Sequence, residues 1–196
     1  QDGPYAKRPG FDQIAQGMGG LMSITGMPGQ GPVRVGIPVA DLSSGNYTTI
    51  AILISLLERE QSGEGQWVHT SLLEAMLCKI DFQGARYTMA GDVPAQQGNF
   101  HPTQVPMGTY EARDGLVNIA ASSPKMWRNF CEALEAQALF EHPDYQDYIG
   151  KLEHREQLNT DVNSVTQTFT VDELVERLNR VGCPCGPIYD VGSAYE

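Results

Sequence analysis

The stretch from Tyr47 to Glu60 constrains the fold of this chain more than any other part of the sequence. Its apolar residues lie around almost the whole circumference of a helix, and charged residues gather only at its end, Glu58-Arg59-Glu60. A helix that is apolar on nearly every side must be covered by protein on nearly every side. We therefore predict a buried helix that ends at the glycines near residue 63 and has N-cap candidates in Asp41-Leu-Ser-Ser-Gly45.

Periodicity and turn residues predict the other elements. Apolar residues at three- and four-residue steps indicate an amphipathic helix over 11–24 that ends at Gly26. The glycines of segment 17–20 favour close helix packing over phosphate binding. Segment 33–39 is predicted as a short strand or an extended entry segment. Strands are predicted at 66–70, 108–111 and 116–121, an extended segment at 183–191, and helices at 71–80, 123–134, 151–166 and 171–181.

Three of these predictions rest on recognised local signals. Ser71 and Thr170 are the expected N-caps of their helices, each followed three residues later by Glu. Asp114-Gly115 marks the turn of a hairpin. Between Tyr87 and Met107 the pattern breaks into a segment rich in Pro, Gly and Gln. We place the domain boundary there, with residues 1–90 in one part and 91–196 in the other.

Composition excludes several classes of function. Thirteen Lys and Arg against 24 Asp and Glu give a formal net charge of -11, which disfavours nucleic-acid binding. The longest apolar run, Ile50 to Leu57, is too short to cross a membrane, and no signal peptide is recognised, so we expect a cytoplasmic protein without a membrane partner. The chain opens with Gln-Asp-Gly-Pro instead of Met, and we expect sequence upstream of it.

Cysteine and histidine spacing predicts neither a disulfide framework nor a metal site. The pair Cys183 and Cys185 has no second pair or His cluster beside it, and the four His match no paired-ligand pattern. Reduced thiols and no metal are expected.

Asp41 is the most informative acidic residue. It stands between an extended segment and a largely apolar helix, where Asp is usually an N-cap. A carboxylate at such a junction can also act chemically, because exposed amides there stabilise negative charge that develops on an attacked acyl group. The residues alone leave both roles open.

Five ordered segments resemble a known family. GPYAKRPGFDQIAQGMGGLMSITG, VGIPVADLSSGNYTTIAILISLLERE and SGEGQWVHTSLLEAM are similar to consecutive blocks of the class III (CaiB/BaiF-type, formyl-CoA transferase-like) coenzyme A transferases, and PMGTYEARDGLVNIAASSPKMWRNFCEAL and FTVDELVERLNRVGCPCGPIYDV to its smaller domain. The resemblance implies an internal fragment with an α/β fold. Residues 1–90 would be a helical remnant of the large Rossmann-like domain, with the nucleophile helix, and 91–196 a small α+β domain.

The resemblance also implies an activity and a site. Asp41 would be the nucleophile in transfer of coenzyme A from an acyl-CoA to a carboxylic acid, through an aspartyl anhydride and an aspartyl-CoA thioester. Arg8, Phe11 and Leu72 would contact CoA, and Gly98, His101 and Gln104 would belong to a loop over the active site, although the family's run of consecutive glycines is missing there. Homodimerisation is expected through residues 11–80.

Two alternatives remain beside the transferase. The same superfamily contains α-methylacyl-CoA racemases, which usually have His where this chain has Phe11; that departure favours the transferase, and Asp12 beside it keeps the racemase open. The family's upstream segment supplies much of the CoA recognition and is absent here, in agreement with the negative charge. The chain is then either an enzyme or a non-catalytic, oligomerising fragment.

Overall fold

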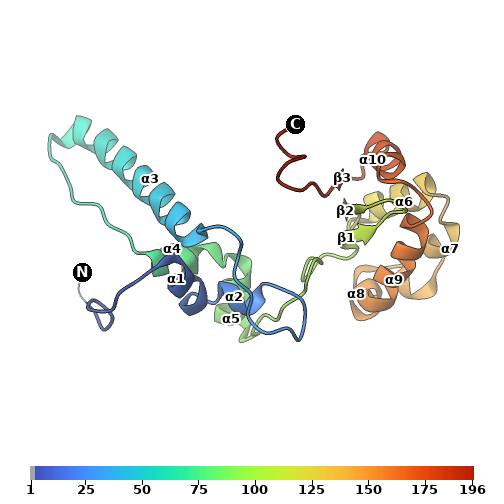
Figure 1. Cartoon of the computed structure of the whole chain (residues 1–196), viewed down its shortest axis with the longest axis horizontal. Coiled ribbons are helices and arrows are strands. Elements are labelled where there is room, and N and C mark those ends of the chain that lie inside the picture. Colours follow the sequence, from blue (N-terminus) through green and yellow to red (C-terminus); the bar gives the residue numbers. More distant parts are fainter. Residues whose placement is uncertain (1–2) are drawn as a thin grey trace. The chain divides into compact units, whose positions relative to one another are not determined.

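The computed structural model describes residues 3–196, which divide into two compact units between Gly98 and Asn99. Figure 1 draws the first unit in blue to green and the second in yellow to red. The expected boundary at residues 90 and 91 lies a little earlier. Residues 91–98 stay with the first unit because Gln96 Nε2 donates to the carbonyl oxygens of Thr25 and Gly31, at 2.6 Å each, and the Gly98 amide donates to Gly26 at 3.0 Å.

The first unit is helical. Its five helices among the described residues are α1 (Asp12–Met18), α2 (Leu21–Ile24), α3 (Val39–Ser62), α4 (Leu72–Lys79) and α5 (Phe82–Ala90). Helices α1, α3 and α4 pack on one another around a small core. That core consists of Ala15, Ala40 and Met76, with Leu21, Val39 and Leu72 packed against it.

A close approach of α1 to α4 explains the glycine cluster. A Cβ added at Gly19 would lie 2.6 Å from Met76 Cβ, so only glycine fits between these helices. The next residue, Gly20, has φ +85, and this left-handed turn divides the predicted 11–24 helix into α1 and α2. The expectation of close helix packing is confirmed at Gly19, whereas Gly20 serves the turn.

The strand predicted at 66–70 is wrong, and segment 33–39, predicted as a short strand or an extended entry segment, forms no strand. The Val33 amide donates to the Met22 carbonyl at 3.1 Å and the Val35 amide to the Gln16 side chain at 3.0 Å, so both amides bond to other parts of the fold and not to a neighbouring strand. Segment 66–70 has no strand beside it among the described residues. Helix α5, which the sequence did not reveal, follows α4 after a sharp turn at Asp81, where φ is 50.

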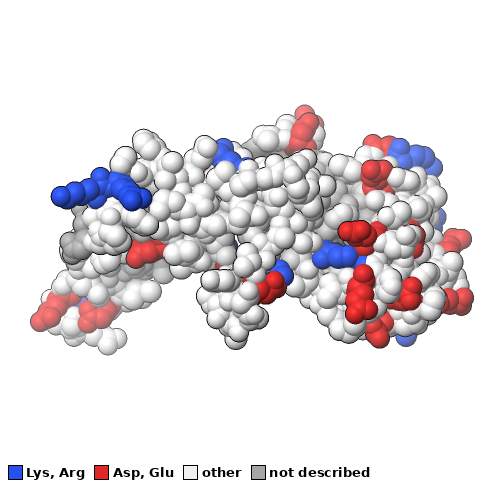
Figure 2. All heavy atoms as spheres, turned by 90° about the horizontal axis from the view of Figure 1, so that it is seen from below, with Lys and Arg blue, Asp and Glu red and all other residues white. Residues whose placement is uncertain are grey.

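Helix α3 leaves its apolar surface uncovered. Exposed side chains include Leu42, Ile50, Ile52, Leu53, Ile54, Leu56 and Leu57. In Figure 2, which views the chain from below, the second unit at the right is dense in charged residues of both signs, and the first unit at the left carries both signs near its outer end. The predicted burial of this helix is therefore not met within this chain, because the first unit holds only a few short helices to cover it.

The second unit combines helices with a small sheet. Its strands β1 (Met107–Glu111), β2 (Leu116–Ala120) and β3 (Cys185–Pro187) form an antiparallel sheet in that order. The helices are α6 (Pro124–Ala133), α7 (Gln137–Phe140), the 3-10 turn η1 (Pro143–Tyr145), α8 (Tyr148–Glu153), α9 (Arg155–Thr166) and α10 (Val171–Arg180). The helix predicted over 151–166 is thus two helices that meet at His154.

One contiguous core holds the second unit together. Helix α9 packs on β1, and α10 packs on β2, β3 and α6. The side chains that β1 and β2 turn inward meet those helices in a core that includes Tyr110, Val117, Ile119, Trp127, Phe130, Leu158, Val162, Leu174 and Leu178. Alternation on the strands and the helical period on α6 and α10 place these residues on matching faces.

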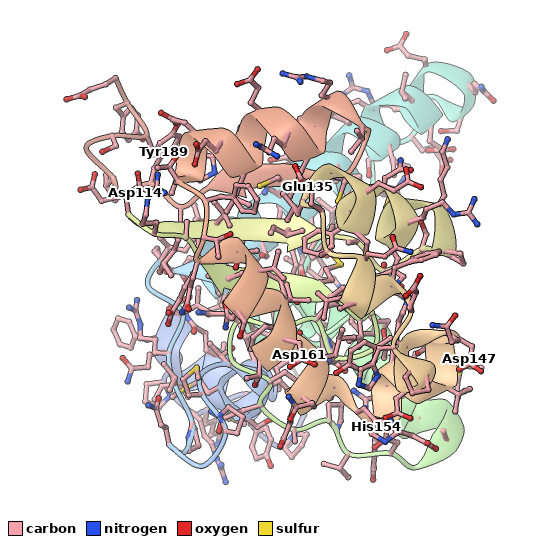
Figure 3. All side chains as sticks on the ribbon, turned by 90° about the vertical axis from the view of Figure 1, so that its right-hand side faces the viewer. Asp114, Glu135, Asp147, His154, Asp161 and Tyr189 are labelled. Atoms are coloured by element: carbon pink, nitrogen blue, oxygen red, sulfur yellow. The ribbon has the colours of Figure 1, made fainter. Side chains whose placement is uncertain are left out.

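The predicted helix and hairpin signals are confirmed. Ser71 Oγ accepts the Glu74 amide at 3.1 Å, which confirms Ser71 as the N-cap, but the return bond that would complete the predicted capping box is not described there. Thr170 forms a full capping box with Glu173. The hairpin joins Glu111 to Leu116, and Asp114 stands at its end in Figure 3. Asp114 Oδ1 accepts the Val171 amide at 2.8 Å, which ties the turn to the start of α10.

Candidate functional site

Asp41 is the third residue of α3 and its side chain is exposed. The interpretation as an N-cap is wrong, because the helix begins at Val39 and its N-cap position is Pro38. No described residue donates a hydrogen bond to the Asp41 carboxylate, and the Asp41 amide has no partner among residues 3–196. The first turn of α3 thus presents an open carboxylate beside an open N–H group.

A different carboxylate satisfies the start of α3. Asp12, in α1, is 7% exposed, and its Oδ1 accepts the Ala40 amide at 2.8 Å. Its Oδ2 accepts from Gln16 Nε2 at 2.7 Å and lies 3.7 Å from Arg34 Nη2. Since both oxygens of this buried group have partners, Asp12 is held as a structural anion at the N-terminus of α3.

Gln16 extends the same network toward the segment that enters α3. It is fully buried, its Oε1 accepts the Val35 amide at 3.0 Å, and its Nε2 donates to the Ile37 carbonyl at 3.3 Å. Gln16 was not identified from the sequence alone. The signal that could have found it was its position four residues after Asp12, which puts both polar side chains on one face of α1.

A surface hollow of about 700 Å³ lies in the same unit. The three residues expected to contact CoA, Arg8, Phe11 and Leu72, all line it. Asp41 does not line it. The two are nevertheless linked through α1, because Ala15 lines the hollow and also packs in the small core with Ala40, the residue before Asp41.

The hollow combines apolar surface with a cation. Phe11 is 76% exposed, and Ile14 and Met18 stand beside it on α1. The guanidinium of Arg8 lies 4.2 Å from the centre of the Tyr5 ring, and it has no carboxylate within 4.0 Å among the described residues. A long thin ligand with an apolar stem and an anionic end matches these groups.

The predicted loop residues fall on both sides of the unit boundary. Gly98 belongs to the first unit, where its φ of +59 and the 2.6 Å that would separate an added Cβ from Met27 Sδ require glycine. His101 and Gln104 belong to the second unit, where His101 Nδ1 accepts the amides of Thr103 and Gln104 at 3.2 and 3.0 Å. That these three residues meet a substrate stays a prediction.

His101 is poised as a neutral acceptor. Burial, followed by the nearby positive charge of Arg155, lowers the pKa of His101 below its usual value. A neutral ring can accept both amide hydrogens at Nδ1, whereas a protonated ring cannot. The lowered pKa therefore preserves the turn at 101–104 near neutral pH.

Neither a membrane span nor a metal cluster is found in residues 3–196. No helix in this range combines the length and hydropathy that a membrane span needs. No three His, Cys, Asp or Glu side chains in the same range gather closely enough to hold a metal ion.

The chain consists of a helical unit, with an open carboxylate at the start of α3, followed in sequence by a small unit of helices and a sheet. The family model for CoA-transferase family III matches residues 1–196. The chain therefore belongs to CoA-transferase family III. This confirms the resemblance drawn from the five sequence segments.

Curated relatives carry names of CoA-transferases. The chain is 35% identical to succinyl-CoA:mesaconate CoA-transferase of Haloarcula hispanica over 96% of this chain and 47% of that protein. It is 31% identical to succinate–glutarate CoA-transferase of Agrobacterium fabrum over 97% of this chain and 48% of that protein. The chain spans about half the length of the curated relatives it matches.

Solved structures agree on the fold. A CaiB/BaiF family protein from Brucella suis is similar with a TM-score of 0.82 and 31% identity, over 99% of this chain and 51% of that one. Rv3272 from Mycobacterium tuberculosis matches with a TM-score of 0.87 at 19% identity, over 100% of this chain and 51% of that one. The predicted CaiB/BaiF-like fold is thus confirmed.

Proposed function

We propose that this chain is the part of a CoA-transferase that carries the nucleophile, Asp41. The observation that carries the proposal is that Asp12, and not Asp41, accepts a backbone amide at the start of α3. Asp12 accepts the Ala40 amide, and the Asp41 carboxylate beside it is exposed and without a partner among residues 3–196. A carboxylate relieved of capping is free to act as a nucleophile.

The proposed reaction has four exchanges of acyl bonds. The Asp41 carboxylate attacks the donor thioester, expels CoA thiolate and forms a mixed anhydride. The thiolate then attacks the Asp41 acyl carbon, which releases the donor acid and leaves an aspartyl-CoA thioester. The acceptor carboxylate attacks that thioester and again expels the thiolate, which attacks the acceptor's acyl carbon to give the new acyl-CoA and free Asp41.

The residues of this chain contribute electrostatics and binding to that scheme. Negative charge develops on an acyl oxygen in each attack, and the open Asp41 amide with the positive end of α3 can stabilise it. In the hollow, Arg8 would meet an anionic part of CoA, and Phe11 and Leu72 would meet its apolar stem. Gly98, His101 and Gln104 are retained as the proposed loop over the substrate.

The names of the relatives suggest which substrates to test. Those from Haloarcula hispanica and Chloroflexus aurantiacus are named for succinyl-CoA, with mesaconate and D-citramalate as the other acids. We accordingly propose succinyl-CoA as donor and a dicarboxylic acid as acceptor. The racemase alternative has no comparable support, because Asp12 is buried and both of its oxygens are occupied.

Trapping the covalent intermediate tests the proposal. The protein is mixed with succinyl-CoA, treated with hydroxylamine or borohydride, digested, and the peptide that contains Asp41 is analysed by mass spectrometry. We expect the hydroxamate or the reduced residue at Asp41 and at no other acid. Asp41→Asn should abolish it. Asp172→Asn, which changes another exposed Asp in the first turn of a helix, should not. Wild-type protein that binds CoA by calorimetry and gives no adduct would contradict the assignment.

We also propose that a second copy of the chain covers part of the exposed apolar surface of α3. Leu53, Ile54 and Leu57 are each more than half exposed, and burying such side chains stabilises an interface. Sedimentation at micromolar concentration should show a dimer, and Leu53→Lys with Leu57→Lys should shift it to monomer. A monomeric wild-type profile would count against a homodimer.

A further inference from the structure

We propose that Asp12 is a positioning residue for Asp41, and that it works with Gln16 as a polar clamp by which α1 holds the start of α3. The inference deepens the proposed function and rests on it for the role of Asp41. The structural part, a clamp formed by Asp12 and Gln16, stands on the hydrogen bonds alone.

The start of α3 has no cap of its own. Pro38 occupies the N-cap position and offers no side-chain oxygen, so the first amides of the helix depend on other residues. The Val39 amide bonds to the Ile37 carbonyl at 2.8 Å. The Ala40 amide bonds to Asp12, which lies 28 positions earlier in the chain. The first turn of α3 is thus anchored by a different helix.

The clamp is held in place because each side-chain oxygen and nitrogen of Asp12 and Gln16 has a hydrogen-bond partner. Asp12 and Gln16 are both buried. The 2.7 Å bond between them links Asp12, which binds the Ala40 amide of α3, to Gln16, which binds the segment before α3. Gln16 contacts the backbone at Val35 and Ile37, two and four residues before Val39. Breaking one bond leaves a buried polar group without its partner, which costs more than the bond contributes on average.

Asp41 follows the anchored residue directly. Its Cα position is fixed relative to Ala40 by one peptide unit, so any shift of the first turn of α3 moves the carboxylate with it. A nucleophile displaced by about 1 Å from its attack geometry can lose on the order of a hundredfold in rate. Loss of the clamp should therefore lower the rate of attack by Asp41 and leave the hollow with Arg8 and Leu72 in place.

Three variants separate the parts of the clamp. Asp12→Ala removes the acceptor for the Ala40 amide. Asp12→Asn keeps one oxygen for that amide and turns a second donor toward Gln16 Nε2. Gln16→Met keeps the Asp12 acceptor for the Ala40 amide and removes the bonds of Gln16 to Asp12, Val35 and Ile37. Thr170→Ala is the matched control, since it removes a helix cap of the second unit.

The experiment has one readout that depends on chemistry and one that does not. The first is the rate at which succinyl-CoA modifies Asp41, measured across donor concentrations. We expect the maximal rate to fall about ten- to a hundredfold in Asp12→Ala and Asp12→Asn, with an unchanged half-saturating concentration. Thr170→Ala should keep the wild-type rate. The second is hydrogen exchange of the peptide that covers 39–44, which should quicken in the Asp12 and Gln16 variants and not in Thr170→Ala.

The outcomes distinguish the two proposals. Wild-type protein without any adduct would remove the proposed function, and faster exchange at 39–44 in the variants would still support the clamp. An adduct that forms at the wild-type rate in Asp12→Asn and Gln16→Met, with unchanged exchange, would overturn the positioning role. Should Asp12→Ala fail to fold, those two variants decide the question.

Discussion

Arg155 donates from Nη2 to the carbonyl oxygen of His101 at 2.9 Å, and from Nη1 to that of Pro102 at 3.1 Å. A residue at the start of α9 therefore fixes the loop in which a substrate-covering role was expected. Tyr148 adds a third tie through its hydroxyl, which donates to the Thr103 carbonyl at 2.9 Å. In the second unit, side chains of Arg155 and Tyr148 thus hold the backbone of residues 101–103 in place.

Removing the Arg155 fork should loosen that turn. In Arg155→Met, two carbonyls lose a charged donor, and we expect the free energy of unfolding of the second unit to fall by about 1.5–3 kcal/mol. Arg155→Lys should recover part of the loss, because one ammonium cannot reproduce the two-pronged geometry. Urea unfolding followed by fluorescence measures both, and unchanged stability in Arg155→Met would show that the turn holds without it.

The contact between Gly19 and Met76 makes a second prediction. Gly19→Ala would put a Cβ 2.6 Å from Met76 Cβ and 2.9 Å from the Ala15 carbonyl, so α1 and α4 would have to move apart. We expect a loss of about 1–3 kcal/mol in the first unit. Gly36→Ala is the control, since nothing lies within 4 Å of its added Cβ. Equal melting temperatures of the two variants would contradict the packing argument.

The third prediction concerns a buried hydrogen bond between Tyr110 and Asn159. The Tyr110 hydroxyl donates to Asn159 Oδ1 at 2.7 Å, and both side chains are buried. Tyr110→Phe leaves the Asn159 oxygen without this donor, which should cost about 1–3 kcal/mol. Tyr189→Phe, at a side chain that is 64% exposed, should change stability very little. Calorimetric unfolding of both variants checks the difference.

Buried thiols should make the second unit less stable in alkali. Burial raises the pKa of Cys131 to about 12, from 9.0 for an exposed thiol, and does the same for Cys183. Between these values the unfolded chain has released a proton that the folded chain keeps, so stability falls as pH rises, by up to about 1.4 kcal/mol per pH unit for each thiol.

Lys151 opposes this trend over part of the range. Burial lowers its pKa from 10.5 to about 8, so between those values the unfolded chain holds a proton that the folded chain lacks, and stability rises with pH. Burial also raises the pKa of Cys185 to about 11, so three thiols oppose one lysine and the net change in stability above pH 9.0 should be a loss. Cys131→Ala should flatten the decline, and Cys78→Ala, at an exposed thiol, should not. Denaturant midpoints across that pH range supply the test, and identical slopes for both variants would argue against it.

The local signals of the second unit could be predicted from the sequence. The hairpin of β1 and β2, the start of α6 after Ser123 and the capping box at Thr170 each depend on residues within a few positions of one another. Such signals carry their own geometry, so a one-dimensional pattern predicts them. The family also followed from the sequence, because five ordered segments resemble it.

The first unit shows the limit of prediction from sequence. Its pattern placed Asp41 at a helix start and offered it as the cap, yet nothing local indicates that α3 begins at Val39 or that Asp12 accepts the Ala40 amide. Those contacts join residues 28 positions apart, and only the packing of α1 against α3 brings them together. The sequence by itself determined the family, the local elements and the presence of a carboxylate at this junction. The tertiary structure decided that Asp12 accepts the amide at the start of α3 and that Asp41 is left open. It did so because hydrogen bonds between distant segments exist only once the chain has folded.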